Sequence, residues 1–116
     1  MNRYYYAELE PDARGFRTFL EVEVIDNKIV NVTLDAKNEE DNPYGLYKTT
    51  SSKYNEEMYA ESGTRYADAV ENLENQIIQG KTTLDRVKGA RFLSQDANEL
   101  LSKIRKMIEE DEQLSN

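Results

Sequence analysis

The chain has 116 residues, a formal net charge of −8 at pH 7, and neither cysteine nor histidine. This length predicts one domain with a modest core, and the composition excludes disulfides, thiolate nucleophiles, the usual zinc sites and histidine-based general base catalysis. The excess of acid disfavours nucleic acid and anionic membrane surfaces as partners.

Three strands are predicted in the first third of the chain. The segment Tyr4–Leu9 is aromatic and extended in character. Residues 16–36 then alternate as a β-hairpin around Asp26 and Asn27, two residue types that tolerate a left-handed backbone. The face of the hairpin that we expect to be buried carries Phe16, Thr18, Leu20, Val22, Val24, Val30, Val32, Leu34 and Ala36.

A loop and a short helix are predicted next. The stretch from Lys37 to Ser51 has no regular apolar period, which is typical of a loop. Ser52 is expected to cap a helix that runs to Ala60. The side chains expected to face inward from this helix are Tyr54, Met58 and Tyr59.

Two amphipathic helices are predicted in the rest of the chain. The first ends at Gly80, and the second is expected to begin with Asp96 and Glu99 as a capping pair. Apolar residues at helical spacing mark the buried stripe of each helix. These stripes are Tyr66, Ala69, Val70, Leu73 and Ile77 in the first helix, and Ala97, Leu100, Leu101, Ile104, Met107 and Ile108 in the second.

Strands followed by helices predict an α+β fold. We expect an antiparallel sheet, made of the N-terminal strand plus the hairpin, packed by two or three C-terminal helices. Residues 1–108 are expected to form a single domain. Residues 109–116 are expected to be an acidic tail that is frayed and solvated.

A basic connector between the last two helices is a candidate phosphate site. Gly89 and Ala90 allow the backbone to approach a ligand, and the N-terminus of the following helix attracts anions. Solvated cations that balance local acids explain the same pattern equally well. The basic residues of this connector are Lys81, Arg86, Lys88 and Arg91.

Other candidate chemistry is weaker. Eight tyrosines offer flat surfaces for stacking a planar ligand, although filling a core that lacks tryptophan is the simpler interpretation. No pair of carboxylates lies in an evidently apolar setting, so no catalytic residue is assigned. The acidic stretch from Asp35 to Gly45 lacks the spacing of a calcium loop, and no metal site is expected.

Several segments occur in a familiar order and spacing. They are the hairpin at residues 21–32, the run Asn38-Glu39-Glu40-Asp41, the run Tyr54-Asn55-Glu56-Glu57-Met58, the pair Ser62-Gly63, the helix from Tyr66 to Leu73, and the segment Val87–Ser94. Together they resemble the FMN-binding domain family, in the short form found in bacterial lipoproteins. The resemblance covers most of the chain.

The resemblance implies a cofactor site at the end of the connector. Family members with covalent flavin have Gly-Ala-Thr here, and the threonine hydroxyl forms a phosphoester with FMN. In this chain Gly89 and Ala90 match, but Arg91 stands in place of the threonine, so covalent attachment at this position is not expected. A guanidinium matches phosphate oxygens well, which implies non-covalent binding of FMN, or of another phosphate-bearing small molecule. The residues expected to bind it are Gly89, Ala90, Arg91, Phe92 and Ser94.

Three functions follow as hypotheses. The first is a flavin-binding or electron-transfer module that is not itself an enzyme. The second is a binding or interaction domain that has kept the fold and lost the cofactor. The third, a hydrolase or transferase using carboxylates alone, is the weakest of the three.

The location is expected from the chain ends and the hydropathy. No stretch approaches the roughly 20 apolar residues of a membrane span, so no membrane insertion is expected. The N-terminus has no apolar signal region, which predicts a cytoplasmic protein as written. An extracytoplasmic location is the expectation only if an export signal has been trimmed away.

Overall fold

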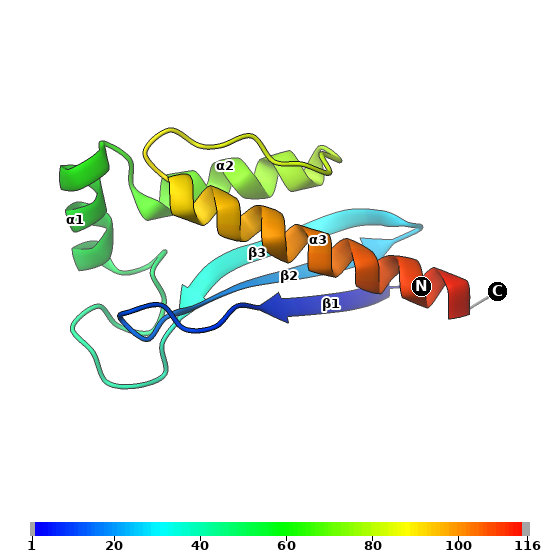
Figure 1. Ribbon diagram of the computed structural model, residues 1–116, viewed down its shortest axis with the longest axis horizontal. Coiled ribbons are helices and arrows are strands. Elements are labelled where there is room, and N and C mark those ends of the chain that lie inside the picture. The colour runs from blue at the N-terminus through cyan, green and yellow to red at the C-terminus, as the bar shows by residue number, and fades with distance from the viewer. Residues whose placement is uncertain (1, 115–116) are drawn as a thin grey trace.

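The computed structural model describes residues 2–114, and within them it contains three strands followed by three helices (Figure 1). The strands form one antiparallel sheet in the order β1-β2-β3. The predicted α+β class is therefore confirmed. The elements are β1 (Asn2–Glu8), β2 (Arg17–Ile25), β3 (Lys28–Lys37), α1 (Ser52–Ser62), α2 (Tyr66–Ile78) and α3 (Arg91–Leu114).

Helices α2 and α3 lie on the same face of the sheet. Helix α2 packs against β3, and α3 crosses β1 and β2 (Figure 1). Their predicted stripes are buried from Tyr66 to Ile77 and from Ala97 to Ile104, whereas Met107 is exposed. None of the helices described has the length and apolar run that crossing a bilayer requires. The largest fully buried side chains are Phe16, Leu20, Val22, Leu34, Leu73, Ile77, Leu100, Leu101 and Ile104.

A β-bulge changes the buried face of the hairpin. Val24 pairs with Ile29, but the preceding residue, Glu23, pairs with Asn31, so Val30 is inserted between two register positions. An inserted residue moves its neighbours to the other face of the sheet. Ile29 accordingly packs against the core and Val30 is exposed. The expectation that Val30 is buried is therefore wrong.

The N-cap of α1 lies one residue earlier than expected. The hydroxyl of Ser51, not that of Ser52, accepts a hydrogen bond from the Tyr54 backbone N–H at 3.1 Å. Tyr54 and Met58 pack against the core as expected, but Tyr59 is exposed, which corrects the prediction that it faces inward. Helix α1 therefore contacts the core through a narrow apolar strip that contains Tyr54 and Met58.

A side-chain amide fastens α1 to the rest of the molecule. Asn55 is the one buried residue of this helix. Its Nδ2 donates to the carbonyls of Lys48 at 2.9 Å and Ser51 at 2.8 Å, and its Oδ1 accepts from the Ala67 N–H at 2.9 Å. The loop before α1 and the first turn of α2 are thus joined through one residue of α1.

Helix α3 is longer than expected at both ends. It starts at Arg91, so Asp96 lies inside the helix and does not cap it. It continues through the predicted tail to Leu114, and the Tyr5 hydroxyl donates to Asp111 Oδ2 at 2.7 Å. The expected fraying is therefore wrong for residues 109–114, because the helix is continuous and tied back to β1. Residues 115 and 116 of that tail lie outside the described residues.

Candidate functional site

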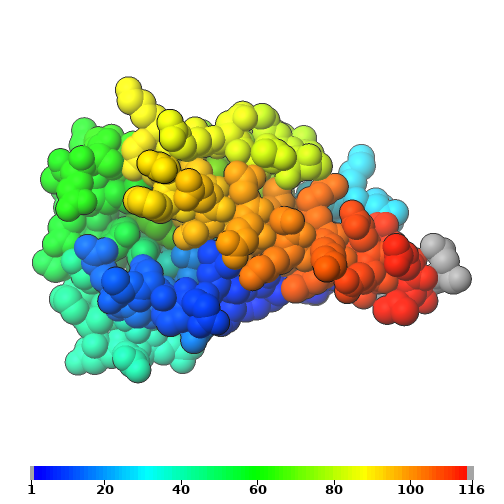
Figure 2. Space-filling model, viewed as in Figure 1, coloured from blue at the N-terminus to red at the C-terminus, as the bar shows by residue number. Residues whose placement is uncertain are grey.

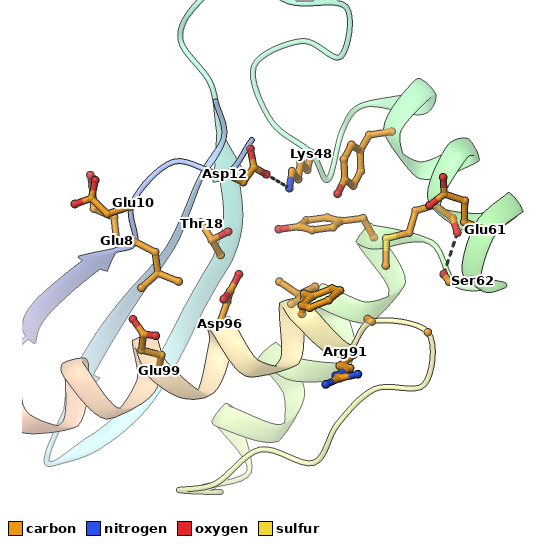
Figure 3. Close-up of a pocket in the computed structure, with 18 of the residues that line it drawn as sticks. Glu8, Glu10, Asp12, Thr18, Lys48, Glu61, Ser62, Arg91, Asp96 and Glu99 are labelled. Atoms are coloured by element: carbon orange, nitrogen blue, oxygen red, sulfur yellow. Dashed lines mark hydrogen bonds and ion pairs between the residues drawn. The ribbon is translucent and has the colours of Figure 1, made fainter. Parts of the chain in front are cut away.

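A cleft of about 940 Å³ opens at one end of the sheet. The loop between β1 and β2, helix α1 and the start of α3 meet around it (Figures 2 and 3). Aromatic and aliphatic side chains form much of its wall. These are Leu9, Tyr54, Met58, Tyr66, Ala90, Phe92 and Leu93.

The charged lining of the cleft is mainly acidic. Among the described residues, no group of acidic side chains is arranged to hold a metal ion. Lys103 pairs with Glu99 at 3.6 Å, and Glu8 pairs with Arg17 at 3.3 Å. The acidic lining residues are Glu8, Glu10, Asp12, Glu61, Asp96 and Glu99, and the basic ones are Lys48, Arg91 and Lys103.

Four of the five residues expected to bind a cofactor line this cleft, namely Gly89, Ala90, Arg91 and Phe92. The fifth, Ser94, lies beneath them and is buried. Its hydroxyl donates to the Ala90 carbonyl at 2.7 Å and accepts from the Val87 N–H at 3.0 Å. Ser94 therefore fixes the connector to the first turn of α3.

Gly89 is held tightly against the turn between α1 and α2. Its φ is +80°, and a Cβ at this position would lie 2.5 Å from Thr64 Oγ1 and 2.9 Å from the Ser62 carbonyl oxygen. The Thr64 hydroxyl donates to the Lys88 carbonyl at 2.8 Å. The wall of the cleft thus depends on a residue without a side chain.

Arg91 lies at the rim of the cleft. Figure 3 shows its guanidinium apart from Asp12, Lys48 and Asp96, which point into the interior. Its Cζ is 5.8 Å from the ring centroid of Phe92, an exposed residue. Arg91 therefore contributes to the outer edge of the cleft, and its guanidinium is directed away from the interior (Figure 3).

The other basic residues of the connector do not join Arg91. Lys81, Arg86 and Lys88 line a separate depression beside α2, and Lys81 pairs with Asp85. The connector therefore does not bring its four cations to a single site.

Lys48 provides a buried cation on the inner side of the cleft, and sequence reasoning missed it. Its side chain is 8% exposed, and its Nζ lies 2.8 Å from Asp12 Oδ2. The same Nζ is 4.6 Å from the ring centroid of Tyr54 and 5.5 Å from that of Tyr66, within the range of cation–π attraction. A lysine in a polar loop has no periodic signal that distinguishes it from a solvated one.

Asp12 is committed to this ion pair. Burial raises the pKa of its carboxyl, but the hydrogen bond from Lys48 and those from the Phe16 and Arg14 N–H groups outweigh burial, and the net pKa is lowered. Both backbone bonds reach Oδ1 at 2.9 Å. The ionised carboxylate is therefore occupied by protein partners, which leaves it poorly suited to act as a catalytic base.

Asp96 has the opposite environment. Burial, followed by the negative charge of Glu99, raises the pKa of its carboxyl, and Lys48 offsets this only in part. Two acids of one cleft thus have pKa values displaced in opposite directions.

The substitution Asp96→Asn is expected to stabilise the protein at pH 7 by about 0.5 kcal/mol. Because the folded-state pKa is raised, the native state binds the proton more tightly. The stability that this proton contributes is present below the unfolded pKa of about 3.9 and is lost as the pH rises through the folded pKa. Urea unfolding should therefore show the gain at pH 7 and its disappearance near pH 3. An equal gain from Glu110→Gln, an exposed acid of the same helix, would attribute the effect to net charge alone.

The Tyr66 hydroxyl is buried without a hydrogen-bond partner among the described residues. The residue is 3% exposed and lines the cleft. Burial raises the pKa of this phenol well above its ordinary value, so it remains a protonated donor. The sequence pattern correctly placed the ring in the core but gave no sign of the unpaired hydroxyl.

Comparisons with known proteins support the fold. No protein-family model and no curated protein matches the chain. The crystal structure of the CPE2226 protein from Clostridium perfringens is similar, with a TM-score of 0.72 and 25% identity over 90% of this chain and 88% of that one. A solution NMR structure from Clostridium thermocellum gives a TM-score of 0.58 and 24% identity over 93% and 92% of the two chains. The architecture therefore recurs in two clostridial proteins, whose names state no activity.

Proposed function

We propose that this chain is a binding module that holds FMN non-covalently in the cleft. The observation that carries the proposal is the position of Gly89, Ala90 and Arg91. These residues resemble the attachment segment of the FMN-binding domain family, and they line the same cleft as Tyr54 and Tyr66. A module of this kind would carry electrons through its flavin and would need no catalytic side chain.

The size and aromatic content of the cleft support a planar ligand. Its volume of about 940 Å³ lies within the usual range for small-molecule sites. The rings of Tyr54 and Tyr66 meet edge to face, with centroids 5.5 Å apart and an interplanar angle of 89°. The two rings pack against each other and both line the cleft, so an aromatic ligand would meet an aromatic wall.

The charges of the cleft define how FMN would lie. A phosphate is repelled by Asp96 and Glu99 in the interior but attracted by the free N–H groups at the start of α3. Arg91 stands at that helix start and at the rim. The phosphate is therefore assigned to the rim and the flavin ring to the interior.

Titration with FMN, followed by flavin fluorescence, tests this function. Bound flavin should return to the supernatant when the protein is denatured, because the attachment is not covalent. Arg91→Ala should weaken FMN binding by about tenfold or more, since it removes a charged hydrogen bond, and should leave riboflavin binding unchanged. Lys88→Ala, a cation of the same connector outside the cleft, is the matched control. Absence of flavin binding, or an equal loss in both variants, would contradict the proposal.

A cofactor-free interaction domain is the second candidate. The acidic interior of the cleft favours it, since a phosphate finds few cations there. A second supporting feature is the uncovered face of the sheet, where Tyr4 and Tyr6 are exposed and Tyr6 stacks on Phe19 at 5.6 Å. The same titration distinguishes the two candidates, because this one requires that no flavin binds.

A further inference from the structure

The unpaired Tyr66 hydroxyl calls for a partner from outside the chain. A buried donor without an acceptor costs free energy, and native structures contain few of them. The ring of Tyr66 is buried at the start of α2, and the residue forms part of the cleft wall. A ligand atom that accepts a hydrogen bond would satisfy the hydroxyl.

Two charged groups face the same interior space. Lys48 gives one hydrogen bond to Asp12, and an ammonium group has three donors. Asp96 points into the cleft toward Lys48 and Asp12 (Figure 3). The interior therefore offers a phenol and an ammonium as donors and the Asp96 carboxylate as an acceptor, with the Thr18 hydroxyl beside them.

This set complements an imide group. An imide, –CO–NH–CO–, presents a carbonyl acceptor on each side of one N–H donor. An uncharged imide also avoids the repulsion that the acidic lining exerts on an anion. Tyr54, whose ring lies beside Lys48, supplies an aromatic surface for the ring system that carries the imide.

We infer that the interior of the cleft is a subsite for the imide edge of a planar heterocycle. The Tyr66 hydroxyl donates to a ring carbonyl, the Asp96 carboxylate accepts the ring N–H, and Lys48 donates to the second carbonyl. The inference rests on the proposed function for the choice of a flavin ring as the probe. Beyond that function, the inference states that the imide edge of the ring enters the cleft first, and it names the three side chains that recognise this edge.

The test uses two neutral ligands that lack the ribityl phosphate. One is lumiflavin, and the other is lumiflavin methylated at the imide nitrogen, which has lost the N–H donor. Wild-type protein should bind lumiflavin about tenfold more tightly than the methylated form, the size of one hydrogen bond in a desolvated site. Asp96→Ala should bind the two ligands equally, because the acceptor that distinguishes them is gone.

Tyr66→Phe isolates the hydroxyl. It keeps the ring and its packing, so the variant should be at least as stable as the wild type while its affinity for lumiflavin falls about tenfold. Tyr59→Phe removes the hydroxyl of an exposed tyrosine outside the cleft and should change nothing. Thermal unfolding of each variant shows whether a loss of binding reflects a loss of folding.

The outcomes separate this inference from the proposed function. FMN binding that is unchanged in Tyr66→Phe, together with equal affinity for both lumiflavins, overturns the imide subsite and leaves the FMN module standing. Lumiflavin binding with the expected discrimination, but without FMN binding, supports the subsite and overturns the nucleotide assignment. If neither FMN nor lumiflavin binds, both are overturned.

Discussion

Asp12→Asn is expected to destabilise the protein by about 3 kcal/mol, because it leaves the charge of Lys48 buried and unpaired. Asparagine keeps an oxygen that can still accept from the Phe16 N–H, so the backbone turn survives and the lost charge is isolated. The new amide N–H₂ would also face the Lys48 ammonium, donor against donor. Urea unfolding at pH 7 measures the change.

Lys48→Met is the matched control. The Asp12 side chain is 36% exposed, against 8% for Lys48, so a carboxylate left alone regains water far more easily than a lysine does. Methionine also fills the space between the aromatic rings with a flexible apolar chain. We expect a cost of at most about 1 kcal/mol, because no buried charge remains. Equal costs for the two variants would contradict the assignment of the Asp12→Asn loss to the unpaired, buried charge of Lys48.

Acid should remove the contribution of Asp12. Its folded-state pKa is lowered, so the stability it provides is present above the unfolded pKa of about 3.9 and is lost as the pH falls through the folded value. The difference between wild type and Asp12→Asn should therefore shrink below about pH 4. If the stability difference between wild type and Asp12→Asn were unchanged at pH 2, the negative charge of Asp12 would not be its cause.

Gly89→Ala is expected to cost about 3 kcal/mol of stability, combining backbone strain at positive φ with a steric clash. The added Cβ would stand 2.9 Å from the Ser62 carbonyl oxygen, which belongs to the backbone and cannot rotate away. Opening this contact would also shift Ala90 and Arg91, so FMN binding should weaken in the same variant. Thermal unfolding and flavin titration measure the two effects.

Gly63→Ala provides the control for strain alone. Its φ is +79°, almost the same as the +80° of Gly89, but nothing lies within 4 Å of the position its Cβ would occupy. We expect a loss of about 1 kcal/mol, the cost of a left-handed backbone for alanine. A loss as large as that of Gly89→Ala would mean that the close approach to Ser62 and Thr64 has no energetic weight.

The sequence was sufficient for the elements that bury a periodic stripe. The α2 residues from Tyr66 to Ile77 repeat at helical spacing, and each one expected in the core is there. The hairpin was predictable for the same reason, since β2 alternates and Asp26-Asn27 supplies the turn with φ of 51° and 63°. Local pattern and tertiary burial agree in these segments.

Features decided by register or by distant contacts were not predictable. Val30 follows the alternation of β3, yet the bulge gives its place to Ile29. Asp96 and Glu99 have the spacing of a capping box, but the helix had already begun at Arg91, after the left-handed turn at Gly89. Neither the bulge at Val30 nor the early start of α3 could be predicted from the alternation or the cap spacing of the nearby residues.

Only part of the cleft lining could be named from the sequence. Residues 89–92 were identified through a family resemblance, and they do line a cleft. The opposing groups, Asp12 and Lys48, lie 36 positions apart in polar loops. Their pairing depends on how the loop before α1 folds over the end of the sheet. No local spacing relates two such residues.

The α3 side and the α1 side of the cleft differ in how firmly they are attached to the core. The α3 side is continuous with the apolar core through Leu93 and Ala97, so moving it would disturb close packing. The α1 side has a narrower attachment, made by the buried amide of Asn55 and by Tyr54 and Met58, which are only partly buried. We therefore expect a ligand too large for the cleft to displace α1. Helix α3 would keep its position on the sheet and would determine where the ligand lies.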